Sequence, residues 1–308
     1  MDGYLAENLQ HIPKFLAQDR DIIMIVSGRG KTRTGKSTIA AQIAAYADFL
    51  LRGGRMDLRR DPETKRFIHP VILKKPVGPP KFTLDNVFFD VEKLMEVAPK
   101  SPKNSIFIVD ESRSGNDSKS SMNALNRRVE IFFDECGALN NFIILVLPDY
   151  FTLSANIATS RSMFLVDVYC DENWKRGYFN FFNEVQKEFL FWMGKKVIGS
   201  FKRYTAANPN FFGRFPDFLP FDRPTYNARK LEAIKKRRIT SREAKTRAKL
   251  GAALSILKEE AKFTTSDVAS KMSFALSQKI TDNMIKNHLK DYTHHLNVVE
   301  KRDLLAKT

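Results

Sequence analysis

The segment GKTRTGKS at residues 30–37 constrains the fold of this chain more than any other feature. It follows the apolar run DIIMIVSG and precedes a stretch in which apolar residues recur at helical spacing as far as residue 51. A glycine-rich loop between a buried strand and an amphipathic helix is the setting in which the pattern GxxxxGK[ST] binds phosphate. The sequence therefore predicts a nucleotide-binding α/β core.

Each part of this loop has an expected role in holding phosphate. The glycines let several backbone N–H groups point at the β-phosphate, and the helix N-terminus adds partial positive charge. Lys36 is expected to reach the β- and γ-phosphates, and the Ser37 hydroxyl to ligate Mg²⁺. The expected nucleotide-binding residues are Gly30, Lys31, Thr32, Arg33, Thr34, Gly35, Lys36, Ser37 and Thr38.

A second motif, SIFIVDE, supplies the carboxylates that hydrolysis needs. Asp110 ends an apolar run, where a carboxylate is costly unless it holds a cation, so we expect it to bind Mg²⁺. Glu111 is placed to orient and deprotonate a water that attacks the γ-phosphate. No guanine-reading N-K-x-D element follows the third apolar run, which favours ATP over GTP. The expected cofactors are ATP and Mg²⁺, with Lys36 and Glu111 in catalysis.

Four apolar runs predict a largely parallel sheet. They are DIIMIVSG, SIFIVDE, NFIILVLPD and RSMFLVDVY, and helical or loop stretches separate them. Runs that are apolar throughout are typical of strands covered on both faces. The expected ATPase domain is residues 1–227, with its core at about 20–170. An aromatic hairpin, formed by RGYFNFFN and KEFLFWMG, and a connector are expected within residues 177–227.

Two polar residues beside the later runs are further catalytic candidates. Asp149, at the end of the third run, is placed either to sense the γ-phosphate or to cap the strand end. Arg161, at the start of the fourth run, either stabilises transition-state charge from a neighbouring subunit or forms a surface salt bridge. Arg127 and Arg128 compete with it for the catalytic role.

The C-terminal residues 228–308 are strongly basic, with 19 Lys and Arg against 9 Asp and Glu, a net charge of +10. A basic segment favours a polyanionic partner such as DNA. Its short helices resemble a winged-helix or helix-turn-helix domain, although similar modules also serve oligomerisation or protein docking. On the DNA-binding interpretation, the outward-facing residues are Asn283, Lys286, Asn287 and Lys290, and the inward-facing ones are Ile285 and Leu289.

Nothing in the sequence indicates export or membrane insertion. The N-terminal residues lack a basic region followed by an apolar one, and the longest strongly apolar run, FIILVLP, is far short of a membrane span. The two cysteines, Cys136 and Cys170, have neither metal-site spacing nor a disulfide framework. We expect a cytoplasmic protein, in the host cytoplasm if it is viral.

The order of GKTRTGKST, SIFIVDE, NFIILVLPD and SRSMFLVDVY resembles the HerA/FtsK superfamily of DNA-pumping ATPases, above all its small archaeal, viral and plasmid-type members, including Zot-like ones. The resemblance covers roughly residues 20–170. It implies a RecA-like P-loop core in a ring, usually hexameric, threaded by double-stranded DNA, with ATP bound between subunits. Many members carry Gln at the sensor position, where this sequence has Asp149.

By this resemblance, Lys36 and Ser37 bind phosphate and Mg²⁺. Asp110 and Glu111 are the metal and catalytic carboxylates, and Arg161 falls where a subunit-bridging arginine is expected. The leading hypothesis is an ATP-driven DNA translocase in which the polar residues 112–123 grip the DNA backbone. Two other hypotheses are an ATP-gated DNA-binding regulator or partition-type protein, and a Zot-like morphogenesis ATPase that acts at a membrane.

Overall fold

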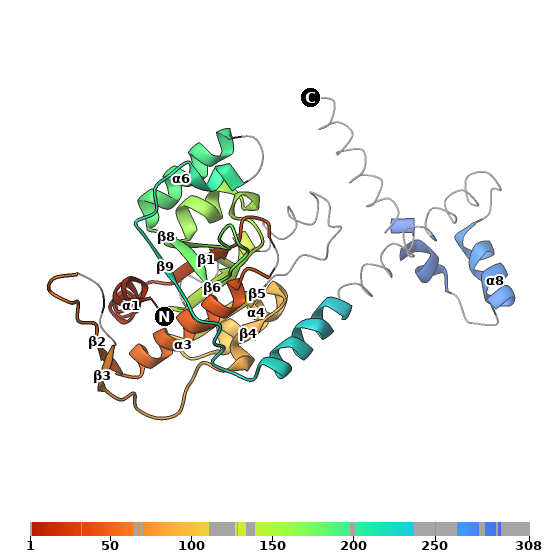
Figure 1. Ribbon diagram of the computed structural model, residues 1–308. Helices are drawn as coiled ribbons and strands as arrows, with labels where there is room; N and C mark the ends of the chain where they lie inside the picture. Colours follow the sequence, from red (N-terminus) through yellow and green to blue (C-terminus); the bar gives the residue numbers. More distant parts are fainter. Residues whose placement is uncertain are drawn as a thin grey trace. The chain divides into compact units, whose positions relative to one another are not determined.

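The four apolar runs form four strands of one seven-stranded sheet in a computed structural model of the chain (Figure 1). The order of the strands is β4-β5-β6-β1-β7-β8-β9. The structure describes residues 2–31, 33–64, 67, 70–110, 127, 129–133, 139–197, 201–236, 250, 264–276, 281–287, 289 and 290. The strands are β1 (Ile22–Ser27), β4 (Val87–Phe88), β5 (Ile106–Asp110), β6 (Phe142–Val146), β7 (Phe164–Tyr169), β8 (Tyr178–Phe182) and β9 (Phe211–Arg214).

The first five strands in this order are parallel, while β8 and β9 pair antiparallel at one edge. Every residue of β1, β5 and β6 is buried, which explains why these runs are apolar throughout. The predicted α/β fold with a mostly parallel sheet is therefore confirmed. β6, the third run along the chain, lies between β1 and β5.

The register of the parallel strands brings their carboxyl ends to one edge of the sheet. Val146 pairs with Val26 of β1 on one side and with Asp110 of β5 on the other. Ser27, the last residue of β1, pairs with Asp167 of β7. Because polar residues of an open parallel sheet meet at this edge, it is the place where a ligand site is expected.

Helices cover both faces of the sheet (Figure 1). Helix α3 (Lys36–Leu51) packs on β1, β5 and β6, and the short helices α1 (Gly3–Leu9) and α2 (Ile12–Leu16) pack against it. On the other face, Ile25 and Leu145 share a core with α4 (Val91–Val97) and α6 (Glu184–Lys196). Apart from the sheet, β2 (Arg55–Asp57) and β3 (Val71–Lys74) form an antiparallel pair.

The segment KEFLFWMG at residues 187–194 is helical, so the prediction that it forms the second strand of an aromatic hairpin was wrong. The Asn183 side chain caps this helix by accepting a hydrogen bond from the Gln186 backbone N–H, 3.0 Å away. Its buried residues, which recur at helical spacing, are Lys187, Leu190, Phe191 and Gly194. Aromatic residues favour strands, and this preference concealed the helical spacing. The aromatic partner of β8 is instead β9, where Phe181 and Phe211 stack with ring centroids 4.6 Å apart.

Lys187 of α6 is fully buried and contacts the end of the π-helix η5 (Asn156–Arg161). Its ammonium donates to the backbone oxygens of Ala158 and Thr159 and to Ser162 Oγ, at 2.6, 3.0 and 3.1 Å. Burial lowers the pKa of Lys187 to about 8, against the opposing charges of Glu184 and Glu188. The amine therefore loses its proton more readily in the folded protein than in the unfolded chain.

This pKa shift predicts a pH-dependent stability. Below pH 8 Lys187 is protonated in both the folded and the unfolded protein, and burying its charge lowers the stability of the fold. Between pH 8 and about 10.5 the unfolded chain binds more protons than the folded protein, so the free energy of unfolding rises with pH. The free energy of unfolding relative to Lys187→Met should therefore be higher at pH 9.5 than at pH 7, as measured by urea denaturation. Lys196→Met, at an exposed position of the same helix, is the control and should show no such trend. A difference between wild type and Lys187→Met that does not change with pH would contradict this account.

The chain divides into two compact units, Met1–Leu231 and Glu232–Thr308. In the second unit, Val268 and Ala269 of α8 (Thr265–Leu276) form a small core with Ile285, and Leu289 packs against this core. The residues expected to face outward, Asn283, Lys286, Asn287 and Lys290, are exposed. This burial pattern agrees with the predicted inward and outward faces of the segment.

Three expectations lie wholly or partly outside the described residues. Glu111, Arg128 and the polar segment 112–123 are not among them. Within the described part of the chain, no helix has the length and apolar character that crossing a membrane requires.

Candidate functional site

The loop between β1 and α3 is tied to the end of β6. The backbone N–H groups of Gly28 and Gly30 both donate to the carbonyl oxygen of Pro148, at 3.2 and 2.8 Å. Gly30 and Gly35 have φ angles of +73° and +100°, which glycine adopts without steric cost. A side chain at Gly35 would also meet the Phe215 ring, 2.9 Å from its Cβ. The glycines of the motif are therefore required by the path of the loop.

Lys36 lies inside the curve of this loop. Its Nζ donates to the backbone oxygen of Lys31 at 2.6 Å and to Thr34 Oγ1 at 3.4 Å. A Cβ on Gly28 would lie only 2.7 Å from this nitrogen, so the glycine leaves room for the lysine. Burial lowers the pKa of Lys36 to about 8, and the charge of Asp110 opposes this shift. The ammonium thus lies at the N-terminal end of α3, where the helix dipole stabilises a bound anion.

Asp110 and Ser37 meet at the same edge of the sheet. The Ser37 hydroxyl donates to Asp110 Oδ2 at 2.8 Å, although 73 residues separate the two in the sequence. Asp110 is 3 % exposed and ends β5, so its charge requires a cationic or hydrogen-bonding partner. A hydroxyl beside a carboxylate is a hard-oxygen pair that suits Mg²⁺, which usually keeps several waters and binds substrate phosphate as well. The donor chemistry of this pair therefore fits the predicted metal.

A cavity of about 920 Å³ opens above these residues. Every described residue of the predicted binding set lines it, namely 30, 31 and 33–38, together with Asp110 and Asp149. Thr32 lies outside the described residues. No group of three or more His, Cys, Asp or Glu side chains in the described ranges could hold a metal by itself. The volume is in the range of pockets that hold a nucleotide-sized ligand.

Asp149 lines the cavity and also caps a helix. It begins the 3₁₀ helix η4 (Tyr150–Thr152), where its carboxylate accepts from the Phe151 N–H at 3.2 Å and from the Tyr204 hydroxyl at 2.6 Å. Arg161 ends η5 and does not line the cavity within this chain.

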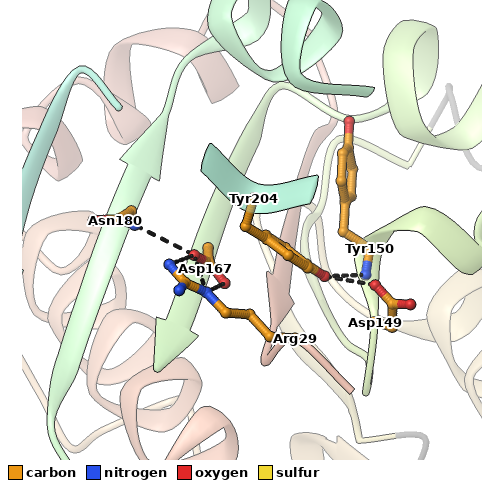
Figure 2. A network of polar contacts seen from close by, with 6 residues as sticks. All are labelled: Arg29, Asp149, Tyr150, Asp167, Asn180 and Tyr204. Atoms are coloured by element: carbon orange, nitrogen blue, oxygen red, sulfur yellow. Dashed lines mark hydrogen bonds and ion pairs between the residues drawn. The ribbon is translucent and has the colours of Figure 1, made fainter. Parts of the chain in front are cut away.

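Arg29 connects the loop to a network of polar contacts with strands β7 and β8 (Figure 2). The Arg29 guanidinium donates to both carboxylate oxygens of Asp167 on β7, with a shortest distance of 2.7 Å, and Asn180 of β8 donates to the same carboxylate at 3.3 Å. Burial raises the pKa of Asp167, and Arg29 opposes this shift. Arg29 also lies over the Tyr169 ring, 4.6 Å from its centroid. The network connects the loop to strands β7 and β8.

The sequence analysis missed the residues that border the cavity on the side of the C-terminal connector. Phe215, Asp217 and Arg223 line it, as do Tyr226 and Lys230 of the helix at residues 223–236. Lys230 Nζ lies 2.8 Å from Asp110 Oδ2, and the Tyr226 hydroxyl donates to the same oxygen. The i, i+4 spacing places Tyr226 and Lys230 on one helix face, but no local pattern relates that face to Asp110.

Fold and site together define an α/β protein with a mostly parallel sheet and a glycine-rich loop at its carboxyl edge. The sequence matches no protein-family model, and it has no significant match among curated proteins.

Proposed function

We propose that this chain is an ATPase that drives double-stranded DNA through a ring of subunits, with ATP bound at the subunit interfaces. The observation that carries the proposal is the meeting of Lys36, Ser37 and Asp110 at one cavity, with β6 between the strands that bear the loop and the carboxylate. A strand inserted at this position is the arrangement expected of motor-type ATPases from the resemblance to the HerA/FtsK superfamily. A RecA-like core is part of the same proposal.

Each residue then has a distinct task. The loop N–H groups and Lys36 bind the β- and γ-phosphates, while Ser37 and Asp110 hold Mg²⁺, whose charge offsets that of the phosphates. Glu111, next to Asp110 in the chain, orients the attacking water and accepts its proton. Asp149, which follows β6 and caps η4, senses the γ-phosphate through its position beside the cavity. Arg161 acts in the site of the adjacent subunit.

The proposed DNA partner is supported by charge. The described exposed residues of the second unit include Lys286 and Lys290 on the face opposite Ile285, and the segment 228–308 carries a net charge of +10. Basic side chains on one face favour contact with the phosphate backbone. A winged-helix or helix-turn-helix domain is the form of this contact that we propose.

One observation favours a second candidate, an ATP-gated DNA-binding regulator. The helix at residues 223–236 contacts Asp110 through Tyr226 and Lys230, and the chain continues from this helix into the basic unit. Such a protein would use nucleotide binding to control DNA affinity and would hydrolyse ATP slowly. Turnover in the presence of DNA separates the two candidates.

The test is steady-state ATP hydrolysis by the full chain with and without long double-stranded DNA. For a motor we expect DNA to stimulate turnover, and Glu111→Gln to lower the rate by about 100-fold or more while ATP binding is retained, since general-base catalysis contributes roughly 10²–10⁴-fold. Asp217→Asn, which changes a carboxylate at the rim of the cavity, is the control and should retain most activity. Turnover that DNA does not change would refute the motor and favour the regulator.

A further inference from the structure

The ammonium of Lys230 occupies the position between the two residues that are proposed to hold the metal. Its Nζ lies 2.8 Å from Asp110 Oδ2 and 3.5 Å from Ser37 Oγ. The carboxylate oxygen that it contacts also accepts the hydrogen bonds of Ser37 and Tyr226. A protein cation therefore neutralises Asp110 at the place where a divalent cation would bind.

This contact is built into the packing of the helix at residues 223–236. The Tyr226 ring is buried, with its centroid 5.7 Å from that of Phe89 and 5.6 Å from that of Phe221. On the next turn, Arg229 Nη1 donates to Asp85 Oδ1 at 2.8 Å and to the Leu84 backbone oxygen at 3.3 Å. Several independent contacts hold this helix so that Lys230 points at Asp110.

The same position cannot hold both cations. The Asp110 side chain is 4 % exposed and that of Lys230 25 % exposed, so water screens a pair of cations at this site poorly. Asp110 Oδ2 already has three donors in Ser37, Tyr226 and Lys230, which is more than its two lone pairs accommodate in favourable geometry. A divalent ion that binds Asp110 Oδ2 and Ser37 would therefore take the place of the ammonium.

We propose that Lys230 acts as a latch, by which we mean that its ammonium occupies the metal position beside Asp110 and Ser37 and leaves this position when the Mg²⁺–nucleotide complex binds. This inference rests on the proposed nucleotide site. In the closed state Lys230 supplies the counter-charge of Asp110 and lowers the affinity of the site for metal. When the metal enters, Lys230 and the hydroxyl of Tyr226 leave Asp110, and the helix at residues 223–236 loses two of its contacts. Binding of the Mg²⁺–nucleotide complex thereby changes the contacts of the helix that leads into the basic unit.

The latch is tested by titrating Mg²⁺ at a fixed concentration of a fluorescent ATP analogue, with the full chain and with Lys230→Met. If the latch is closed about nine-tenths of the time, Lys230→Met should lower the Mg²⁺ concentration for half-saturation by about tenfold. Binding of the analogue in EDTA should change by less than about twofold, because the latch opposes the metal and not the phosphates. Lys235→Met, which removes a positive charge from an exposed position of the same helix, is the matched control and should leave the metal dependence unchanged.

Tyr226→Phe provides a second variant in case Lys230→Met folds poorly. It keeps the buried ring, removes only the hydroxyl that contacts Asp110, and should lower the half-saturating Mg²⁺ concentration in the same direction by a smaller factor. Hydrogen exchange of residues 223–236 should increase in the wild type on adding Mg²⁺ and the analogue together.

Three outcomes would overturn the latch. An unchanged Mg²⁺ dependence in both variants would refute it while leaving the nucleotide site intact. Weaker binding of the analogue by Lys230→Met, both with Mg²⁺ and in EDTA, would show that Lys230 is a phosphate ligand instead. Failure of the wild type and all variants to bind the analogue would refute the proposed nucleotide site and the latch together.

Discussion

Replacing Arg29 by methionine is expected to lower the free energy of unfolding by about 3–5 kcal/mol, because removing one partner of a buried ion pair leaves the other charge uncompensated. Arg29 Nη2 and Nε lie 2.7 and 3.0 Å from Asp167 Oδ2, and the Asp167 side chain has no exposed surface. After the change only the Asn180 amide, at 3.3 Å, would remain beside the carboxylate. Urea denaturation at pH 7 measures the loss.

Arg33→Met is a closely matched control for this prediction. Arg33 belongs to the same loop and has nearly the same left-handed φ, +57° against +52° for Arg29, but its side chain is exposed. Its replacement should cost less than about 0.5 kcal/mol, as is usual for exposed sites. Because burial raises the pKa of Asp167, the deficit of Arg29→Met should shrink as the pH falls and the carboxyl is protonated. Equal losses for the two variants would contradict the anchoring role of Arg29.

Replacing Lys36 by methionine is expected to weaken ATP binding roughly 10- to 150-fold, the equivalent of about 1.5–3 kcal/mol for a hydrogen bond between charged groups. The Lys36 ammonium lies at the start of α3 and lines the cavity, where a bound phosphate would supply it with an anionic partner. Methionine keeps an unbranched side chain of similar size and removes the charge. The protein should stay folded, since the contacts of Nζ in the loop are with neutral oxygens.

Lys31→Met separates the role of Lys36 from the overall charge of the loop. Lys31 is exposed, and its Nζ lies 4.6 Å from the centroid of the Trp174 ring, so its loss removes the same charge without touching the helix start. The affinity for ATP should fall by less than about fivefold, as for an exposed charge pair worth up to about 1 kcal/mol. An effect of Lys31→Met as large as that of Lys36→Met would contradict the assigned role of Lys36.

The parts of this site that lie within one motif could be read from the sequence. Gly30, Gly35, Lys36 and Ser37 are close together in the chain, and loop sterics and the helix start fix their positions. The meeting of Ser37 with Asp110 was also predictable, because carboxyl ends of parallel strands share one edge. The hydrophobic runs were sufficient to predict the parallel strands, since strands buried on both faces are apolar throughout.

Other contacts depend on packing that no local pattern encodes. Lys230 reaches Asp110 because aromatic contacts of Tyr226 and the pairing of Arg229 with Asp85 dock its helix beside the cavity. The Arg29–Asp167 pair requires the register of β7 against β1, which the sequence of neither strand specifies. Part of helix α6 was predicted as a strand because its Phe and Trp residues favour strands. The signal for the start of the helix, the capping residue Asn183, is a single residue and did not outweigh that preference.

Calorimetric titration of the 308-residue chain with ATP in excess Mg²⁺ tests the central claim most directly, because hydrolysis, DNA transport and the Lys230 latch all require a nucleotide at this cavity. We predict saturable binding of one ATP per chain by the wild type. Under the same conditions, Lys36→Met should bind at least about tenfold more weakly. No saturable binding by the wild type, or equal binding by the wild type and Lys36→Met, would contradict the account.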